Sequence, residues 1–387
     1  MMDKFDVTIV GGGFSGLLCA KELSAKNLSV KVIEEHNEIG YPNKCSGVIS
    51  SKTMQLLNFP FSKNIVENRF SKILFYSPES IKISLDFKEN EIFVLNRYNL
   101  DNYLAEEAIK NGAEISILSK VTSFLQNDTE VKIKVNDNQI ITSNYLVDAR
   151  GANYYTDKMG LYNGVQAYAF YRDFDPDAIH VFFDKTIAPG FFAWLIPINE
   201  RLAKVGLASK SNSFELIKAF FKRIGIKNYI KINFSPIVIG GVKENLVKDK
   251  ILFVGDSAGQ TKPTTGGGIY FGGMGSILLA NALYNKILNP SISLVEVYER
   301  SWFLNFDKEI KLMKFVRSIF ENMDNNGLEK LFSIAKDVLS NTTILNIDYD
   351  LHISSILKSI GIKNALKISG KVFGRTVTMI LKSLITG

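Results

Sequence analysis

The sequence of 387 residues predicts an α/β fold with a C-terminal helical region. Three observations predict it: a glycine-rich turn between apolar segments in residues 5–34, alternating β-rich stretches at 71–94 and 164–209, and helical spacing after about residue 281. No internal repeat, low-complexity tract or Pro/Ser-rich linker separates these parts. We therefore expect domains that interleave along the chain rather than independent modules in series.

The first 34 residues have the pattern of a βαβ unit. Residues 5–10 are apolar and β-rich, 11–16 form a turn, 17–26 have helical spacing, and 28–34 are a second apolar strand. Further along, 100–111 predicts a helix, and 117–146 returns to strand-like alternation with a turn at 136–138. The opening pattern is typical of a Rossmann-type domain with a parallel sheet.

The turn in this unit carries the spacing of a dinucleotide-binding motif. Gly11 makes the tight turn, Gly13 admits a pyrophosphate to the backbone, and Gly16 lets the helix pack against the strand. Glu34 ends the second strand, where a carboxylate accepts both ribose hydroxyls; Glu35 is the second choice for this position. A carboxylate here disfavours a 2′-phosphate, so we expect an adenine dinucleotide other than NADP.

The composition excludes several classes of protein. Two cysteines in so long a chain argue against a disulfide scaffold and fit a reducing cytosol. The absence of a CxxC pair and the presence of only three histidines, without triad or metal spacing, argue against a metal site. No apolar run reaches about 18 residues and no basic region precedes an apolar stretch at the start, so we expect neither a membrane-spanning helix nor a secretory signal. The expected location is cytoplasmic.

A second glycine-rich region distinguishes the chain from a simple dehydrogenase. Residues 146–151 and 251–256 are apolar strands that end in Asp-Ala-Arg-Gly and Gly-Asp, and ten of the 28 glycines lie between Gly240 and Gly275. A simple dehydrogenase needs no such second loop, whereas a long ligand of two parts does. These motifs therefore favour a dinucleotide that spans both ends of the domain.

With these motifs, the sequence resembles the FAD-dependent oxidoreductases of the aromatic-hydroxylase fold, and within them the archaeal geranylgeranyl reductase family. The resemblance covers about residues 1–300. The motifs that carry it are GGGFSG (11–16), PNKCSG (42–47), NRYNLD (96–101), DARG (148–151), FFAWLIP (191–197) and GDSAGQTKPTTGGGIYFGGMGS (255–276). The two glycine-rich motifs are specific for the FAD superfamily, and the Cys45 loop and the FxWxIP stretch point to the reductases.

The resemblance implies FAD as the cofactor. Glu34 would hold the adenosine ribose, Arg97 the phosphate or ribose region, and Asp256 the ribitol or pyrophosphate. The loop 263–268 would direct backbone N–H groups at the N1–C2=O edge of the flavin, where reduced flavin is negative. The residues expected to bind the cofactor are Gly11, Gly13, Phe14, Ser15, Gly16, Glu34, Glu35, Cys45, Ser46, Gly47, Arg97, Val121, Gly255, Asp256, Gly266, Gly267, Gly268 and Ile269.

The resemblance also implies a substrate side. Phe192, Trp194, Pro197 and Gly206 would form one wall of an apolar pocket that takes a long hydrocarbon chain. This chain departs from the family pattern at Ile196, where the family has Phe, and the other interpretation is an aromatic strand that faces a core. A second departure is Ala208, which stands where the family has the second glycine of Gly-x-Gly.

Cys45 and Trp194 are the expected catalytic residues. A thiol beside a flavin can shield it or donate a proton, whereas Cys19, inside the first helix, has the position of a small buried hydrophobe. The structural alternative for Cys45 is the same buried hydrophobe. The structural alternative for Arg97 is a surface residue at the start of the 100–111 helix.

The expected activity is hydrogenation of isolated C=C bonds in geranylgeranyl chains of membrane-lipid precursors, with the substrate a prenyl diphosphate or a glycerophospholipid. An external donor, namely NADPH, a ferredoxin or a deazaflavin, would supply the electrons. Two rivals stay open: a flavin monooxygenase or halogenase of the same fold, and an FAD-binding protein that associates with RNA. The first 350 residues lack the basic patches with interleaved aromatics that nucleic-acid binding requires, so we expect no nucleic-acid partner.

The predicted domains follow from the placement of these motifs. A discontinuous FAD-binding domain takes residues 1–70, 91–157 and 240–300, a substrate domain takes 71–90 and 158–239, and a helical region with a basic tail takes 301–387.

The net charge of +7 is concentrated in this tail. From residue 351 onward there are six basic residues and no acidic one, which leaves 40 basic against 39 acidic residues before it. Lys363, Lys367, Lys371 and Arg375 recur every four residues, the spacing of a basic amphipathic helix that can lie on an anionic membrane surface. The alternative is a solvated face on a helix that packs against the rest of the protein, and Gly370 and Gly374 weaken the helix prediction.

Overall fold

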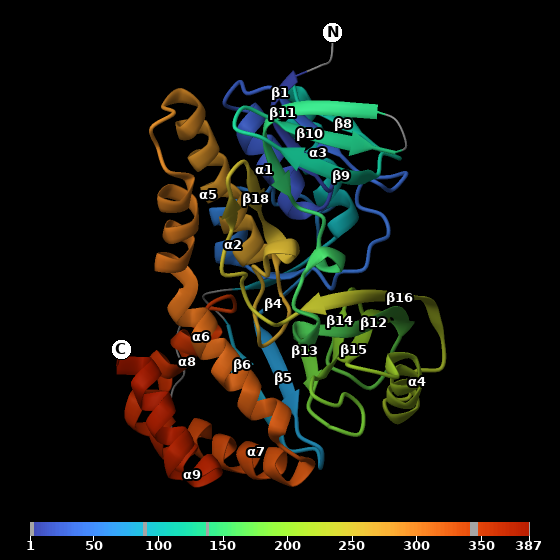
Figure 1. Cartoon of the computed structure of the whole chain (residues 1–387). Helices are drawn as coiled ribbons and strands as arrows, with labels where there is room; N and C mark the ends of the chain where they lie inside the picture. Colours follow the sequence, from blue (N-terminus) through green and yellow to red (C-terminus); the bar gives the residue numbers. More distant parts are fainter. Residues whose placement is uncertain (1–3, 88–90, 137–138, 341–346, 387) are drawn as a thin grey trace. The chain divides into compact units, whose positions relative to one another are not determined.

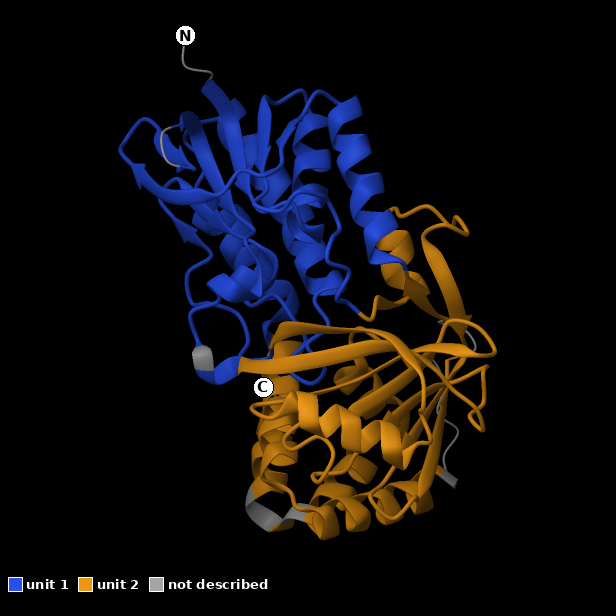
Figure 2. Ribbon diagram, turned by 90° about the vertical axis from the view of Figure 1, so that its right-hand side faces the viewer, with its two compact units in different colours: residues 1–45, 96–160, 238–307 blue, residues 46–95, 161–237, 308–387 orange. Residues whose placement is uncertain are grey.

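The computed structural model describes residues 4–87, 91–136, 139–340 and 347–386 (Figure 1). The chain divides into two compact units, each made of three segments (Figure 2). Unit 1 comprises residues 1–45, 96–160 and 238–307, and unit 2 comprises residues 46–95, 161–237 and 308–387. Both units are therefore discontinuous in sequence.

Unit 1 contains, over its described residues, an eight-stranded sheet with the order β17-β18-β11-β1-β2-β8, with β10 and β9 added beside β11. Its strands are β1 (Lys4–Val10), β2 (Val30–Ile33), β8 (Glu114–Ser116), β9 (Val121–Gln126), β10 (Val131–Val135), β11 (Gln139–Asp148), β17 (Val247–Lys248) and β18 (Ile251–Phe253). β1 pairs in parallel with β2 and β11, and β11 in parallel with β18. The carboxyl ends of these four strands therefore meet at one edge, where sheets of this kind bind ligands.

The helices of unit 1 hold this edge in place. They are α1 (Phe14–Ser24), α3 (Arg97–Lys110) and α5 (Ile269–Leu288), with short 3₁₀ turns η1 (Ala152–Tyr154), η2 (Lys158–Gly160) and η3 (Gly255–Ala258) and the π-helical η4 (Val295–Arg300). α1 packs against both α3 and α5. Leu17, Leu18 and Leu23 of α1 are fully buried, as expected for a helix covered on several sides.

Unit 2 contains two sheets over its described residues: one of seven strands in the order β16-β12-β15-β14-β13-β5-β6, and one of three in the order β3-β7-β4. The strands are β3 (Val48–Ser50), β4 (Val66–Phe70), β5 (Lys72–Tyr76), β6 (Lys82–Asp86), β7 (Ile92–Leu95), β12 (Leu161–Phe170), β13 (Ile179–Phe182), β14 (Ala193–Pro197), β15 (Leu202–Ser209) and β16 (Tyr229–Val238). β13 pairs in parallel with β5, whereas β12, β15, β14 and β13 form antiparallel pairs in succession.

The helices of unit 2 are α2 (Ser51–Leu56), α4 (Ser213–Arg223), α7 (Asn325–Ser340), α8 (His352–Ile360) and α9 (Ile362–Thr386), and α6 (Ser301–Asn322) enters it from residue 308. α4 covers β12 and β15, and its Ile217 and Phe220 join their side chains in a fully buried core. α9 packs against α7 and α8. Gly374, with φ 80° and ψ −172°, interrupts α9, so the predicted tail helix forms in two parts.

The predicted α/β fold with its helical C-terminal region is confirmed, and the elements differ from the sequence predictions mainly at their ends. The helix predicted at 100–111 begins earlier, at Arg97, because the Asn96 side chain accepts the Asn99 N–H at 3.1 Å and caps it. The first helix begins at Phe14, inside the predicted turn. Residues 137–138 of the predicted turn at 136–138 lie outside the described residues.

The unit boundaries also differ from the predicted domain boundaries. Residues 46–70, expected in the FAD-binding domain, belong to unit 2, because β3 and β4 both pair with β7. Residues 308–387, expected as a separate region, belong to unit 2 as well. One reason is that buried Asp350 accepts hydrogen bonds from the Ser50 and Thr53 hydroxyls at the start of α2.

Candidate functional site

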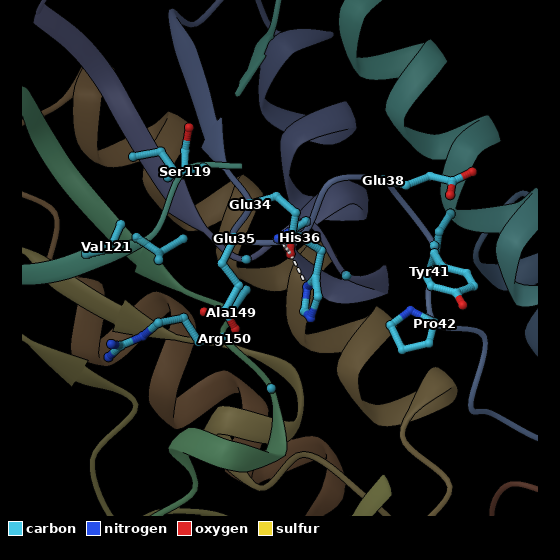
Figure 3. A pocket seen from close by; sticks show the side chains of 18 of the residues that line it. Glu34, Glu35, His36, Glu38, Tyr41, Pro42, Ser119, Val121, Ala149 and Arg150 are labelled. Atoms are coloured by element: carbon cyan, nitrogen blue, oxygen red, sulfur yellow. Dashed lines mark hydrogen bonds and ion pairs between the residues drawn. The ribbon is translucent and has the colours of Figure 1, made fainter. Parts of the chain in front are cut away.

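A cavity in unit 1 lies where β1 and β2 end (Figure 3). The glycine turn 11–13 lines this cavity together with Glu34 and Glu35, which follow directly after β2. In Figure 3, Val121 and Arg150 lie on one side of the cavity, and Tyr41 and Pro42 on the other. Five predicted cofactor residues are thus brought together here: Gly11, Gly13, Glu34, Glu35 and Val121.

Glu34 is the polar centre of this cavity. Its side chain is buried, with the residue only 8% exposed. Its Oε2 accepts the Gly12 N–H at 2.6 Å, and its Oε1 accepts the His36 N–H at 2.8 Å and lies 2.5 Å from His36 Nδ1. These bonds hold the carboxylate in one orientation, and each oxygen has more than one lone pair. Glu34 can therefore accept hydrogen bonds from the hydroxyl groups of a ligand and keep its hydrogen bonds with Gly12 and His36.

The glycines of the turn divide into those that the chain itself requires and one that faces open space. Gly11 has φ +109°, and a Cβ on it would lie 2.4 Å from the Ala149 carbonyl oxygen. A Cβ on Gly16 would lie 2.1 Å from the Gly11 carbonyl oxygen, so α1 approaches β1 as closely as the motif predicts. A Cβ on Gly13 would meet nothing within 4 Å. The space beside Gly13 is the space that a pyrophosphate needs.

Arg97 stands in the first turn of α3 and is not a surface residue. Its Nε and Nη2 donate to Asp101 Oδ1 at 3.1 and 3.0 Å, and Nη2 also donates to Oδ2 at 3.0 Å. The guanidinium lies 5.1 Å from the centre of the Phe14 ring and has a hydrogen bond with the Cys45 side chain. Burial would lower the pKa of Arg97, but Asp101 and Cys45 outweigh it and raise the pKa, so the group stays charged.

Asp256 follows β18 in the turn η3. Among the described residues, no group donates a hydrogen bond to its carboxylate, and burial raises the pKa of this group while the charge of Arg97 acts against the rise. A Cβ on Gly268 would lie 2.8 Å from Asp256 Oδ1, so the carboxylate faces the start of α5. An acceptor placed this way can accept a hydrogen bond from a ligand.

The loop before α5 satisfies part of its own backbone. The Gly266 N–H donates to the Lys262 carbonyl at 2.7 Å, and the Gly267 N–H donates to Thr265 Oγ1 at 3.3 Å. These two N–H groups, which were expected to face a flavin, therefore already have acceptors within the loop. The helix α5 begins directly after this loop, at Ile269, and the N-terminus of a helix is a general site for accepting negative charge.

In unit 2, the aromatic strand β14 crosses a glycine of β15. Trp194 and Gly206 are register partners, and a Cβ on Gly206 would lie 2.6 Å from Trp194 Cζ2. Trp194 Nε1 donates to Gln166 Oε1 at 3.0 Å, which fixes the indole across Gly206. Phe192 and Trp194 are partly exposed, whereas Phe191 and Pro197 are buried. Phe191 and Pro197 thus have the burial that the core interpretation predicts, whereas Phe192 and Trp194 are the partly exposed aromatics, of which Trp194 also packs against a buried cluster.

Known proteins resemble this chain in sequence and in fold. Residues 4–161 match the family model of the FAD binding domain. An uncharacterized protein of Methanocaldococcus jannaschii is 30% identical, over 95% of this chain and 98% of that protein. A digeranylgeranylglycerophospholipid reductase of Methanosarcina acetivorans is 28% identical, over 87% of this chain and 90% of the reductase. The solved structure of a geranylgeranyl bacteriochlorophyll reductase-like protein from Thermoplasma acidophilum matches with a TM-score of 0.86 and 21% identity, over 99% of this chain and 100% of that one.

The chain belongs to the archaeal geranylgeranyl reductase family. It is an FAD-dependent oxidoreductase, and the expectations of this family and of FAD are confirmed. Three features of this geranylgeranyl reductase family member fit the cofactor: the buried carboxylate of Glu34 in the cavity lining, the open space beside Gly13, and the acceptor of Asp256, to which no described residue donates. The roles of all the predicted cofactor residues, and those assigned to Cys45 and Trp194, stay predictions.

Sequence reasoning did not identify several residues that line the cavity of this geranylgeranyl reductase family member: His36, Tyr41, Ser119, Arg150 and Tyr154. His36 is one of the three histidines without triad or metal spacing, and its Nδ1 lies 2.5 Å from Glu34 Oε1. Arg150 donates from Nε and Nη2 to Asp148 at 3.0 and 2.7 Å, and its place at the end of the Asp-Ala-Arg-Gly strand was the available signal.

No group of three or more His, Cys, Asp or Glu among the described residues could hold a metal ion. No helix among the same residues combines the length and the apolar character that crossing a membrane requires.

Proposed function

We propose that this protein hydrogenates isolated C=C bonds in the geranylgeranyl chains of archaeal membrane-lipid precursors, with reduced FAD as the hydride source. The kinship with a digeranylgeranylglycerophospholipid reductase over most of both chains supports this substrate class. The observation that carries the proposal is the partly exposed aromatic pair Phe192 and Trp194, held across Gly206. An apolar face of this kind suits a long hydrocarbon, whose binding free energy comes mainly from buried apolar area.

An isolated alkene has no carbonyl to polarise it, so orientation must supply much of the rate. Reduced FAD supplies a hydride to one alkene carbon when it is bound. The other carbon takes a proton from a protein acid or an ordered water, so the C=C bond becomes CH–CH and the cofactor is oxidised. Cys45, whose side chain contacts Arg97, is the acid that the family resemblance suggests. Glu34 and Asp256 hold the ribose and ribitol hydroxyls, and Phe192 and Trp194 orient the geranylgeranyl chain of the substrate.

The test is a single-turnover reaction with FAD-loaded protein reduced by dithionite under anaerobic conditions, which bypasses the natural donor. Mass spectrometry of the lipid should detect the gain of H₂ per double bond with digeranylgeranylglycerophospholipid or with geranylgeranyl diphosphate. If the FAD stays reduced and neither lipid gains hydrogen, the proposal is wrong. NADPH, reduced ferredoxin and reduced deazaflavin, offered in turn instead of dithionite, then identify the class of donor.

The rival activity is that of a flavin monooxygenase or halogenase. The stretch FxWxIP resembles the Trp-x-Trp-x-Ile-Pro of halogenases, but Phe192 stands in place of its first Trp. NADPH- and O₂-dependent hydroxylation or halogenation of an aromatic compound, with no lipid reduction, would favour the rival. Salt-dependent RNA binding without flavin turnover would favour the RNA-associated protein instead.

The C-terminal helix supports a peripheral association with an anionic membrane surface, which we include in the proposal. Lys363, Lys367 and Lys371 are exposed on α9, and the apolar Met379 and Ile380 are 59% and 46% exposed near Lys382. Exposed cations beside exposed apolar side chains are the combination that binds anionic lipid headgroups. The side chain of Arg375, the fourth member of the predicted basic row, lies outside the described residues.

Liposome co-sedimentation tests this association with point variants that leave the helix in place. Replacing Lys363, Lys367 and Lys371 with glutamine should weaken binding to vesicles with anionic lipids by about 100-fold, at roughly 1 kcal/mol per basic residue. Binding to neutral vesicles should stay weak in both proteins. A chain that ends after Ile362 gives the limiting case, and equal binding by all three proteins would contradict the proposal.

A further inference from the structure

Lys204, in the middle of β15, is fully buried at 0% exposure. Lysine is almost never buried without partners, and here a carboxylate and two backbone carbonyls surround the ammonium group. The Nζ lies 2.6 Å from Glu67 Oε2 and donates to the carbonyl oxygens of Ser46 at 3.1 Å and of Leu95 at 3.2 Å. Two of the three N–H donors of the ammonium group therefore have carbonyl acceptors, and the Glu67 carboxylate balances its charge.

The two carbonyls belong to backbone segments that lie side by side. The Leu95 N–H donates to the Gly47 carbonyl at 2.9 Å. Gly47 has φ +77°, and a Cβ on it would lie 2.2 Å from the Leu95 carbonyl oxygen, so only glycine permits this approach. Lys204 therefore donates a hydrogen bond to each of two neighbouring backbone segments, through the carbonyls of Ser46 and Leu95.

Each of these segments leads directly to a predicted site residue. Ser46 follows Cys45 in the sequence, and Leu95 precedes Asn96, the residue that caps α3 one position before Arg97. Cys45 and Arg97 in turn contact each other through the thiol and the guanidinium. The buried Lys204 ammonium thus binds backbone next to Cys45 and close to Arg97, and the positions of both side chains depend on that backbone.

We propose that Lys204 is a positioning residue for the Cys45 loop: its ammonium fixes the peptides next to Cys45 and Asn96 and so sets the thiol where Arg97 meets it. A buried ion pair contributes little net stability compared with well-packed apolar side chains, so stability alone does not require a lysine here. Charge-assisted hydrogen bonds are about twice as strong as neutral ones and are directional, which suits them to holding two carbonyls. The functional value of this placement rests on the proposed function, but the placement itself does not.

The test measures alkylation of the two cysteines by iodoacetamide, peptide by peptide, across a range of pH. Cys45 is partly exposed and reports the loop, whereas Cys19 is fully buried in α1 and reports global unfolding in the same sample. The main variant is the double substitution Lys204→Met with Glu67→Gln, which removes the ammonium without leaving a buried carboxylate alone. Glu67→Gln by itself is the matched control, because it keeps the ammonium and both carbonyl bonds, and Cys19 in the same sample reports whether loss of the counter-ion unfolds the protein.

We expect the double variant to label Cys45 about tenfold faster and with a changed pH profile, because two charge-assisted hydrogen bonds are lost, while Cys19 stays protected. The control should retain the profile of the parent. Lys204→Gln in the Glu67→Gln background can still donate to the carbonyls and should give an intermediate rate. Equal Cys45 profiles in the parent and the double variant would overturn the proposal, and so would labelling of Cys19 in both Lys204 variants, since Lys204 would then serve the whole fold. None of these readouts depends on lipid turnover, so a failure of the proposed function is recognised separately.

Discussion

Gly13 in unit 1 and Gly206 in unit 2 are both glycines beside a predicted site, and the space next to each is used differently. A side chain at Gly13 would meet nothing within 4 Å, whereas one at Gly206 would collide with Trp194 and with the Val165 carbonyl oxygen, each at 2.6 Å. The first glycine leaves room for a ligand, and the second leaves room for a side chain of the protein itself. The comparison teaches that a glycine at a site indicates close approach, and that only the structure shows what approaches.

The largest expected effect separates two glycines of the same turn. Gly16→Ala places a Cβ 2.1 Å from a backbone oxygen, so it should destabilise the fold by about 3 kcal/mol and abolish FAD binding. Gly13→Ala has no clash in the protein, so its free energy of unfolding should change by less than about 0.5 kcal/mol. Its FAD affinity should nevertheless fall about 100-fold, or about 2.7 kcal/mol. Urea unfolding without FAD and titration of FAD fluorescence measure the two quantities.

If Gly13→Ala binds FAD as the parent does, the open space beside Gly13 is not the pyrophosphate site. The comparison with Gly206 then loses its basis, because neither glycine would face a ligand.

The second effect concerns the two neighbouring acids at the end of β2. Glu34→Gln keeps the size of the side chain but removes the charge that accepts the ribose hydroxyls, so FAD affinity should fall by about 10- to 100-fold. Glu35→Gln is the matched control because Glu35 lines the same cavity but is exposed, and its affinity should change by less than about twofold. Calorimetric titration with FAD measures both. If Glu35→Gln loses more FAD affinity than Glu34→Gln, Glu35 is the residue that binds the ribose.

How much of each region could be predicted depends on how far apart its parts lie in the sequence. The turn at 11–16 and Glu34 were predictable because three glycines and one acid occur at fixed offsets within one βαβ unit. Lys204 was not, because its carbonyl partners lie 109 and 158 residues away and only the pairing of strands brings them together. Phe192 and Trp194 were predicted from a family motif, but the crossing over Gly206 requires the register of β14 and β15.

The third effect tests the aromatic face of unit 2. Trp194→Phe removes apolar area and the indole N–H, so kcat/KM for the lipid should fall about tenfold, or about 1.4 kcal/mol of transition-state stabilisation. Gln166→Leu is the control: it removes the acceptor at 3.0 Å but keeps the indole, and its effect should be smaller. Initial rates with both lipid substrates measure the loss. Equal rates for Trp194→Phe and the parent would mean that β14 is an aromatic strand of the core. Gly206 would then serve only the packing of Trp194.

The smallest effect concerns the pH dependence of stability, which should originate in unit 2 rather than at the FAD cavity. His180 of β13 is buried: Nε2 donates to the Asp175 carbonyl at 2.8 Å, and Nδ1 accepts from the Tyr76 hydroxyl at 3.0 Å. Burial lowers the pKa of His180, with the nearby Asp175 acting against the shift. Both ring nitrogens are therefore satisfied in the neutral form, and a proton on Nδ1 would remove the acceptor of Tyr76.

The sign of the effect follows from the two states of this histidine. Because its pKa is lower in the folded protein than the ordinary value of about 6.5, the unfolded chain binds more protons below that pH. Stability should therefore decrease as the pH falls from about 6.5 toward 5, with a slope of at most about 1.4 kcal/mol per pH unit for one proton. Urea unfolding at a series of pH values should detect this slope in the parent and in Tyr76→Phe, which leaves His180 buried. His180→Gln should flatten it, and an unchanged slope in that variant would place the acid sensitivity on another group.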